Sequence, residues 1–179
     1  MKIGFCGTMS VGKTTLVNAL KELPEFKNYT FRTERSKYLR DLGIPLNTNS
    51  TIKGQTVFLS ERVAELMDEN IITDRTVVDV MSFAQCSKSM NHQERNDFIN
   101  LASHLIHEYD YIFYISPEGV EIEDNGVREI DSKYRNEIDF TIIRFLDKYH
   151  QNIKNLIRLE GTTEERIKVI QETLFFTYL

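Results

Sequence analysis

Two glycines, a lysine and a threonine near the start of the chain have the spacing of a phosphate-binding loop. The segment Gly7-Thr-Met-Ser-Val-Gly12-Lys13-Thr14 matches the pattern G-x-x-x-x-G-K-[ST], directly after an apolar run and directly before a helical pattern. The glycines permit a backbone whose N–H groups point inward at phosphate oxygens, beside the positive end of a helix dipole. The sequence therefore predicts a site for the triphosphate of a nucleotide from Gly7 to Thr15.

The polar side chains of this loop have separate expected tasks. Lys13 places a positive charge at the β and γ phosphates, Thr14 offers its hydroxyl to a Mg²⁺ ion that bridges them, and Thr15 donates a further hydrogen bond. The alternative is a glycine-rich turn with a lysine on the surface. We expect ATP and Mg²⁺ as ligands, bound by Gly7, Ser10, Gly12, Lys13, Thr14 and Thr15.

Charged residues follow the third predicted strand. Asp74-Arg75 ends an apolar segment, and Asp79 follows about one helical turn later. Ligands of open parallel sheets gather outside the carboxyl ends of the strands, so these residues are expected near the phosphate loop. Asp74 is a candidate to accept the proton of an attacking hydroxyl or to hold a magnesium-bound water, with a helix cap as the alternative. Arg75 and Asp79 are candidates for contacts with an acceptor substrate.

Two further groups of charged residues are candidates for substrate contacts. Glu34-Arg35 follows the second predicted strand, where such a pair binds ribose hydroxyls or a substrate phosphate, unless Arg35 belongs to a solvated helix face. Arg128 and Arg135 lie in a segment, roughly residues 118–137, that is expected to close over the nucleotide as a lid. Arginines in a lid would contact the phosphoryl oxygens during transfer, and their alternative is an ordinary surface ion pair.

The overall composition favours one globular domain over residues 1–179. The chain has 41% hydrophobic residues, and its net charge of -5 is spread along the sequence without a basic strip for nucleic acid. Cys6 and Cys86 are too few and too differently placed for a disulfide framework or a metal site. His104 and His107 are expected at the surface. We expect a cytoplasmic protein, since neither a signal-peptide layout nor a stretch of membrane-spanning length is visible.

The hydrophobic periodicity predicts five strands that alternate with helices. The strands are expected at 2–6, 29–33, 70–74, 111–115 and 155–159, with 111–115 as a central strand. Helices are expected at 13–23, 34–42, 52–68, on the apolar stripes that begin at Val77 and Phe98, from 131 or 132, and after the capping box Thr162-x-x-Glu165. The third helix should bury Leu59, Val63, Leu66 and Met67. This alternation predicts an α/β fold with three layers, a parallel sheet with helices on both faces.

The motifs taken together resemble those of the small P-loop kinases. Besides the loop, the segments that carry the resemblance to the AAA-type ATPase/kinase group are Glu34-Arg35, Asp74-Arg75, Asn125-Gly126-x-Arg128 and Leu159-Glu-Gly161. That group includes the nicotinamide riboside kinase domain of bacterial NAD regulators and many phage-encoded proteins, among them kinases that phosphorylate hydroxymethyluracil in phage DNA. The resemblance implies a P-loop NTPase fold, a nucleoside or nucleotide kinase, Asp74 as base or metal partner, and Arg128 and Arg135 as lid residues. A phage-encoded protein would work in the host cytoplasm.

One departure from the P-loop pattern concerns the metal. Many P-loop ATPases end a central strand in an acidic residue, whereas this chain has Ile115-Ser116. If Ser116 takes that place, the metal-bound water must be held by Asp74, Asp79 or Glu34.

Two classes of function remain open on the sequence. A kinase would transfer the γ-phosphoryl group of ATP to a hydroxyl or phosphate of a free nucleoside or nucleotide, or to a hydroxymethylated base in phage DNA. Its acceptor ring would stack on an aromatic residue, for which the candidates are Tyr38, Phe58, Phe83 and Tyr134. The alternative is an ATPase or nucleotide-dependent switch acting on a protein partner. Size favours the kinase, because the residues after Thr162 leave little room for the extra helical domain of a motor.

Overall fold

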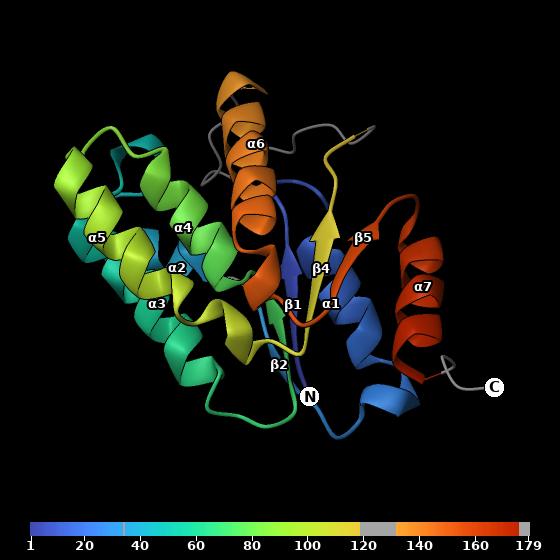
Figure 1. Cartoon of the computed structure of the whole chain (residues 1–179). Coiled ribbons are helices and arrows are strands. Elements are labelled where there is room, and N and C mark those ends of the chain that lie inside the picture. The colour runs from blue at the N-terminus through green and yellow to red at the C-terminus, as the bar shows by residue number, and fades with distance from the viewer. Residues whose placement is uncertain (34, 119–131, 176–179) are drawn as a thin grey trace.

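The computed structural model describes residues 1–33, 35–118 and 132–175. Its sheet has the strand order β2-β3-β1-β4-β5, and every pairing is parallel. All strands therefore place their carboxyl ends at one edge of the sheet (Figure 1). The strands are β1 (Lys2–Cys6), β2 (Thr30–Arg32), β3 (Ile71–Asp74), β4 (Tyr111–Ile115) and β5 (Leu156–Leu159). The prediction that 111–115 is a central strand is confirmed, because β4 pairs with β1 on one side and with β5 on the other. The middle position of the sheet is held by β1.

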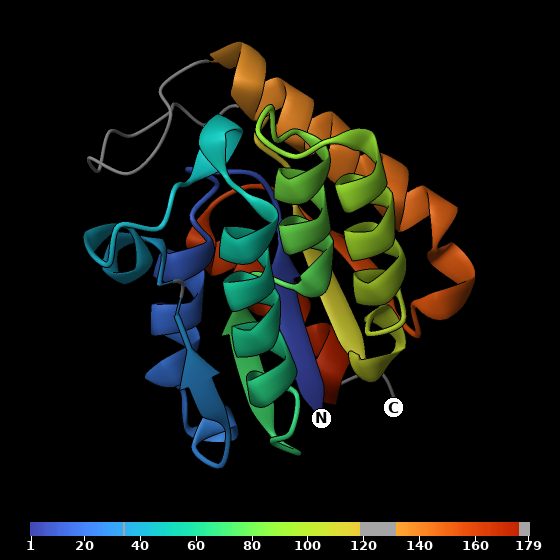
Figure 2. The ribbon, with the colours of Figure 1, turned by 90° about the vertical axis from the view of Figure 1, so that its left-hand side faces the viewer.

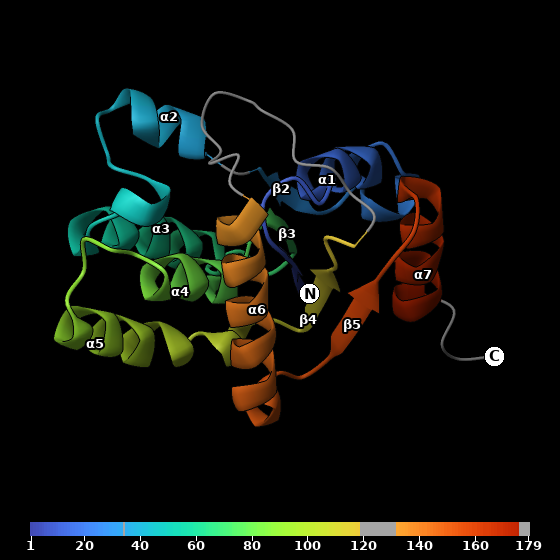
Figure 3. The same ribbon diagram turned by 90° about the horizontal axis from the view of Figure 1, so that it is seen from above.

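Helices cover both faces of the sheet. The core of one face contains residues of α1 and α7, and the core of the other face contains residues of α3, α4, α5 and α6 (Figures 2 and 3). The predicted three-layer α/β fold is confirmed. The α-helices are α1 (Lys13–Lys21), α2 (Ser36–Asp41), α3 (Ile52–Glu65), α4 (Val77–Gln85), α5 (His92–Ser103), α6 (Ser132–Lys148) and α7 (Thr163–Phe175). The short 3-10 helices are η1 (Pro24–Phe26), η2 (Asn47–Asn49), η3 (Ile106–Glu108) and η4 (His150–Asn152). No helix in these ranges is long and apolar enough to cross a bilayer.

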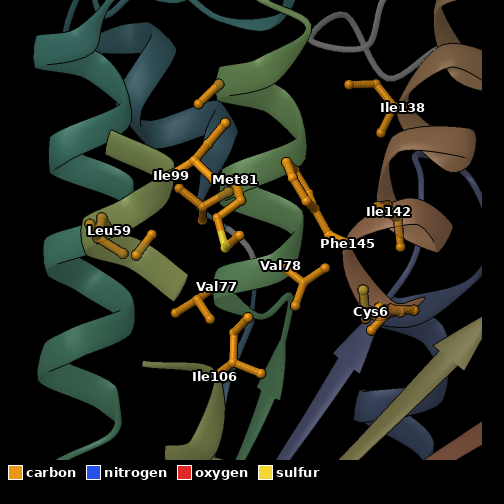
Figure 4. Packing of buried hydrophobic residues seen from close by; sticks show 14 of the residues in the cluster. Cys6, Leu59, Val77, Val78, Met81, Ile99, Ile106, Ile138, Ile142 and Phe145 are labelled. Carbon is orange, nitrogen blue, oxygen red and sulfur yellow. The ribbon is translucent and has the colours of Figure 1, made fainter. Parts of the chain in front are cut away.

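The alternation of side chains along β1 divides the core in two. Ile3 and Phe5 pack with α1 and α7, whereas Cys6 belongs to the larger cluster under α4 and α6 (Figure 4). Gly4 lies on that second face, where an added Cβ would be 2.4 Å from Thr76 Cγ2. The missing side chain therefore lets the turn before α4 approach β1, next to the phosphate loop.

Side-chain caps fix where the helices begin. Thr76 and Asp79 form a capping box at α4, and Asn91 and Glu94 form another at α5. The predicted box before α7 is confirmed, because Thr162 N donates to Glu165 Oε2 at 2.7 Å and Glu165 N donates to Thr162 Oγ1 at 3.3 Å.

Some predicted core positions are wrong. Met67 is 80% exposed, and Val63 is exposed as well. Met67 follows the end of α3 at Glu65, so the helical period that placed it on the buried face stops before it. His104 and His107 are exposed, as predicted.

Candidate functional site

The loop between β1 and α1 has the backbone that phosphate binding requires. Gly12 and Ser10 have positive φ angles of 84° and 60°. At Gly7 a Cβ would lie 2.7 Å from the carbonyl oxygen of Ile115, so a side chain there would collide with the end of β4. Gly12 caps α1 without any side-chain hydrogen bond, which leaves the first N–H groups of the helix for a ligand.

Lys13 is folded back onto its own loop. Its Nζ donates hydrogen bonds to the carbonyl oxygens of Gly7 and Thr8 at 2.6 and 2.7 Å. Burial and, after it, the positive charge of Arg75 lower the pKa of Lys13 to about 8, while Asp79 and Asp74 oppose the shift. The Lys13 amino group therefore lies inside the loop, where the sequence predicts that phosphate oxygens bind.

Asp74 lies against the threonine that follows Lys13. Because β3 pairs with β1 and Asp74 stands opposite Phe5, its carboxylate reaches the first turn of α1. Thr14 Oγ1 donates a hydrogen bond to Asp74 Oδ2, and the other oxygen, Oδ1, is buried with no hydrogen-bond partner among the described residues. The alternative role of Asp74 as a helix cap does not apply, since Thr76 caps α4.

This pair of residues fits a magnesium ion by its chemistry. A hydroxyl and a carboxylate are the hard oxygen ligands that Mg²⁺ prefers, and the buried, unbonded Oδ1 of Asp74 lacks a donor that a metal-bound water would supply. Ser116 directly follows β4, which flanks β1 on the side opposite to β3. Its Oγ accepts a hydrogen bond of 3.4 Å from Arg158. Of the two described carboxylates considered for the metal, Asp74 and Asp79, the structure brings Asp74 to Thr14.

Asp79 ties α4 to the loop from within. Its side chain is fully buried, with Oδ1 accepting from Gly7 N at 3.1 Å and Oδ2 accepting from Thr76 N and Thr76 Oγ1 at 2.8 and 2.9 Å. Both carboxylate oxygens of Asp79 therefore accept hydrogen bonds from within the protein, from two backbone N–H groups and the Thr76 hydroxyl.

Arg75 connects the phosphate site with a second hollow. Its φ of 93° is in the left-handed region, which is rare for a residue with a Cβ. The guanidinium lies 5.0 Å from the ring centroid of Phe83, and Nη1 is 3.8 Å from Asp79 Oδ1. Arg75 thus reaches from the turn beside the loop into the wall of a pocket.

The pocket beside Arg75 is mainly apolar and aromatic. Gln55 in its wall is only 3% exposed. The lining residues are Ser36, Leu46, Asn47, Gln55, Phe58, Arg75, Val80 and Phe83. Of the four predicted stacking residues, Phe58 and Phe83 line it. Tyr38 instead lies on the surface under Arg35, and Tyr134 is buried in the core.

Two arginines hold carbonyl groups of the phosphate loop. Arg135, in the first turn of α6, donates from Nε to Met9 O at 3.2 Å, and its own carbonyl accepts from Thr8 Oγ1 at 3.1 Å. Arg166, in α7, donates from Nη1 to Val11 O at 2.7 Å. The loop is therefore anchored to a helix on each face of the sheet.

The remaining predicted residues are spread around this centre. Thr14 and Thr15 are solvent-exposed at the start of α1, and Arg35 pairs with Glu61 at 3.2 Å before α2. Glu34 and Arg128 lie outside the described residues, as does most of the expected lid. Residues 132–137 of that expected lid form the beginning of α6.

A sequence profile of the family described as AAA domain matches residues 2–166, from β1 into the first turn of α7. The chain belongs to this family. The resemblance to the AAA-type ATPase/kinase group is thereby confirmed. No curated protein matches the chain in sequence.

Solved structures similar to this AAA-domain protein share its fold. Deoxyadenosine kinase from M. mycoides with bound dCTP has a TM-score of 0.70 at 19% identity, covering 97% of this chain and 98% of that one. NadR protein in complex with NR has a TM-score of 0.76 at 17% identity, covering 99% of this chain and 52% of that one. NadR in complex with NAD and AMP-PNP has a TM-score of 0.73 at 15% identity, covering 99% and 50%. The TM-scores show a shared fold, and identities this low support no more than that. The chain spans about half the length of NadR.

Sequence reasoning missed three residues of the AAA-domain site. Gln55 and Arg62 are polar residues of α3 that face inward, and Arg166 is an inward arginine of α7. The signal was their spacing from the buried Leu59: Gln55 lies four residues before it and Arg62 three residues after it, so all three share one face of the helix. A pattern read from apolar residues alone does not detect it.

Proposed function

We propose that this protein is an ATP- and Mg²⁺-dependent kinase that transfers the γ-phosphoryl group to a hydroxyl or phosphate of a nucleoside-like acceptor. The observation that carries the proposal is the shared turn Asp74-Arg75, where one side chain meets Thr14 and the next lines a separate pocket. A kinase needs two substrates side by side, whereas an ATPase needs one nucleotide site and water.

In the nucleotide half, the loop amides and Lys13 would bind the triphosphate. Lys13 would exchange its hydrogen bonds to Gly7 O and Thr8 O for bonds to phosphate oxygens. The negative charge of the phosphates would stabilise the buried ammonium group. Arg135 already contacts the loop at Met9, so it would lie beside the phosphates without travelling with a lid. Arg128 remains a proposed lid residue.

In the metal position, Thr14 and Asp74 would hold Mg²⁺. The ion would supply positive charge at the β and γ phosphates as negative charge redistributes during transfer. The contact of Asp74 with Thr14 supports the metal role over that of a proton acceptor for this carboxylate.

In the acceptor half, the pocket has the features of a site for a planar heterocycle. Phe58 and Phe83 offer ring surfaces, and the nearly buried amide of Gln55 offers both a donor and an acceptor to the edge of a base. Arg75, in the pocket wall nearest to Asp74, would bind a hydroxyl or phosphate of the acceptor. The described lining includes no carboxylate, and a loose phosphoryl transfer needs little help from a base.

The similar solved structures and the net charge favour a small nucleoside-type acceptor. Deoxyadenosine kinase and NadR are named for or crystallised with nucleoside-type ligands, and the net charge of -5 disfavours a long polyanion. A free nucleoside or nucleotide is therefore our first proposal, with a hydroxymethylated base in DNA as the second.

The test is incubation with γ-labelled ATP and Mg²⁺ against nucleosides, nucleoside monophosphates, nicotinamide riboside, plain DNA and DNA that contains hydroxymethyluracil. Label on a small acceptor supports the first proposal, and label on modified DNA supports the second. Label released only as free phosphate would contradict a kinase and favour the ATPase or switch.

A further inference from the structure

One buried arginine outside the proposed set contacts the turn that carries both halves of the site. Arg62, on α3, has a side chain only 4% exposed. Its Nη1 donates hydrogen bonds to the carbonyl oxygens of Asp74 at 3.2 Å and of Arg75 at 3.3 Å. Its Nη2 donates to Glu65 Oε1 at 2.8 Å, so the buried guanidinium also has a carboxyl partner on its own helix.

The backbone at this turn needs such a partner. Arg75 has a φ of 93°, and an L-residue adopts that region only where its surroundings enforce it. On the N–H side, Arg75 N donates to Phe5 O at 3.0 Å and Thr76 N donates to Asp79. On the C=O side, Arg62 is the residue that binds both successive carbonyls, so the turn is held from two directions.

The hydrogen bonds of Arg62 to this turn affect the directions of the two side chains that extend from it. Asp74 points to Thr14, and Arg75 lines the pocket with Phe83. Because they are consecutive residues, a rotation of the intervening peptide would move the metal-side carboxylate and the pocket-side guanidinium together.

We propose that Arg62 is a positioning residue, which sets the directions of Asp74 and Arg75 through their carbonyl groups, with Glu65 as the hydrogen-bond partner that holds its guanidinium. The proposal rests on the proposed function, in which Asp74 serves Mg²⁺ and Arg75 serves the acceptor. Arg62 itself touches neither substrate.

The experiment compares Arg62→Met and Arg62→Lys with a matched control, Arg95→Met. Arg95 also holds two backbone carbonyls, those of Ser87 at 2.8 Å and Met90 at 2.9 Å, but at the start of α5. Three quantities are measured: the unfolding midpoint, the Mg²⁺ dependence of binding of a fluorescent ATP analogue, and kcat and KM for the labelled transfer.

For Arg62→Met we expect the Mg²⁺ concentration at half-maximal gain in analogue binding to rise about 10- to 100-fold, as for other residues that orient a metal ligand. Binding of the analogue without Mg²⁺ should be unchanged, kcat should fall by a similar factor, and Arg62→Lys should recover part of both losses. Arg95→Met should lower the unfolding midpoint and leave the Mg²⁺ dependence and kcat unchanged.

The outcomes separate this proposal from the proposed function. If the wild type phosphorylates no acceptor, the function is wrong, and the Mg²⁺ dependence of analogue binding still decides the role of Arg62. An equal Mg²⁺ midpoint in wild type and Arg62→Lys and Arg62→Met would overturn the positioning role, as would wild-type binding without any Mg²⁺ dependence. Should Arg62→Met fail to fold, Arg62→Lys carries the comparison alone.

Discussion

The hydroxyl of Thr14 donates a hydrogen bond to Oδ2 of Asp74, which joins the first turn of α1 to the end of β3. The contact exists because β3, although three α-helices and a strand separate it from β1 in the chain, pairs directly with β1. It brings a hydroxyl and a carboxylate to the edge where the phosphate loop lies, and it is the basis of the first prediction.

Asp74→Asn removes the negative charge and keeps the size of the side chain. We expect phosphoryl transfer to fall by about 100-fold or more, because the metal loses an anionic partner, while nucleotide binding without Mg²⁺ stays close to wild type. Labelled transfer and titration of the fluorescent ATP analogue, with and without Mg²⁺, measure the two effects.

The matched control is Asp110→Asn, at the other end of the sheet. Asp110 accepts hydrogen bonds from Lys2 N and Lys154, before β4 begins, so the same chemical change there should leave transfer unaltered. A full rate for Asp74→Asn would remove this carboxylate from the proposed mechanism.

Lys13 gives nucleotide binding a pH dependence. Its pKa of about 8 in the free protein means that the ammonium is lost above that pH, whereas bound phosphates would restore a higher pKa. Binding should therefore take up almost no proton at pH 7 and approach one proton at pH 9, with an affinity that falls by at most about tenfold per pH unit above 8. Calorimetry in two buffers of different ionisation enthalpy measures the uptake.

Two substitutions make the assignment specific. Lys13→Ala should abolish transfer, since the loop loses its cation. Lys21→Ala, at the exposed end of the same helix, should keep the proton uptake of the wild type. Uptake that persists in Lys13→Ala, at whatever affinity remains, would assign it to another group.

The fold was predictable because its strands and helices are locally marked. The period of two in the strands, the period of 3.6 in the helices and the capping residues place β1, β4 and α7 within a residue or two of their observed bounds. The central position of β4 was predictable from its strand-like residues, whereas the full strand order was not, since it depends on the crossovers. The shortest strand, β2, and the shortest α-helix, α2, were predicted to be longer than they are.

The site was predictable where a motif carries its own geometry and much less so elsewhere. The phosphate loop is fixed by local backbone, so its residues could be named from spacing. The inward face of α3 depends on the turn Asp74-Arg75, whose carbonyls accept hydrogen bonds from Arg62, and this places Arg62 inside and leaves Val63 exposed. A polar residue that is buried to serve distant backbone leaves no apolar pattern in the sequence.

Gln55 supplies a prediction for the acceptor pocket. Gln55→Leu keeps the bulk of the side chain and removes both its donor and its acceptor, so kcat/KM for the acceptor should fall by about 10- to 100-fold, the equivalent of one or two lost hydrogen bonds. The KM for ATP should not change, because Gln55 does not line the phosphate loop. Steady-state kinetics with each substrate varied in turn measure the split.

Gln93→Leu is the control for this substitution. Gln93 lies at the start of α5, where its amide donates to Asp97 at 2.8 Å on the surface, so its loss should leave both kinetic constants unchanged. An acceptor kcat/KM of wild-type size in Gln55→Leu would show that the pocket is not where the acceptor binds.

Glu65 gives the stability of the protein a pH dependence. Burial raises the pKa of this carboxyl to about 7 from an ordinary value of 4.5, although Arg62 opposes the shift. Between these two values the folded state keeps a proton that the unfolded state has released, so the free energy of unfolding falls as pH rises from about 4.5 to 7. The fall is at most about 3 kcal/mol, at 1.36 kcal/mol per pKa unit.

Glu65→Gln should remove this fall, because the amide does not titrate in that range. Its constant offset will include the altered contact with Arg62, so the slope against pH, from urea unfolding at several pH values, is the quantity that tests the assignment. Glu108→Gln is a control of opposite sign: Lys2 lowers the pKa of Glu108, so that carboxyl contributes stability that is lost as pH falls below its ordinary range. A Glu65→Gln variant with the wild-type slope between pH 4.5 and 7 would mean that another buried group holds the proton.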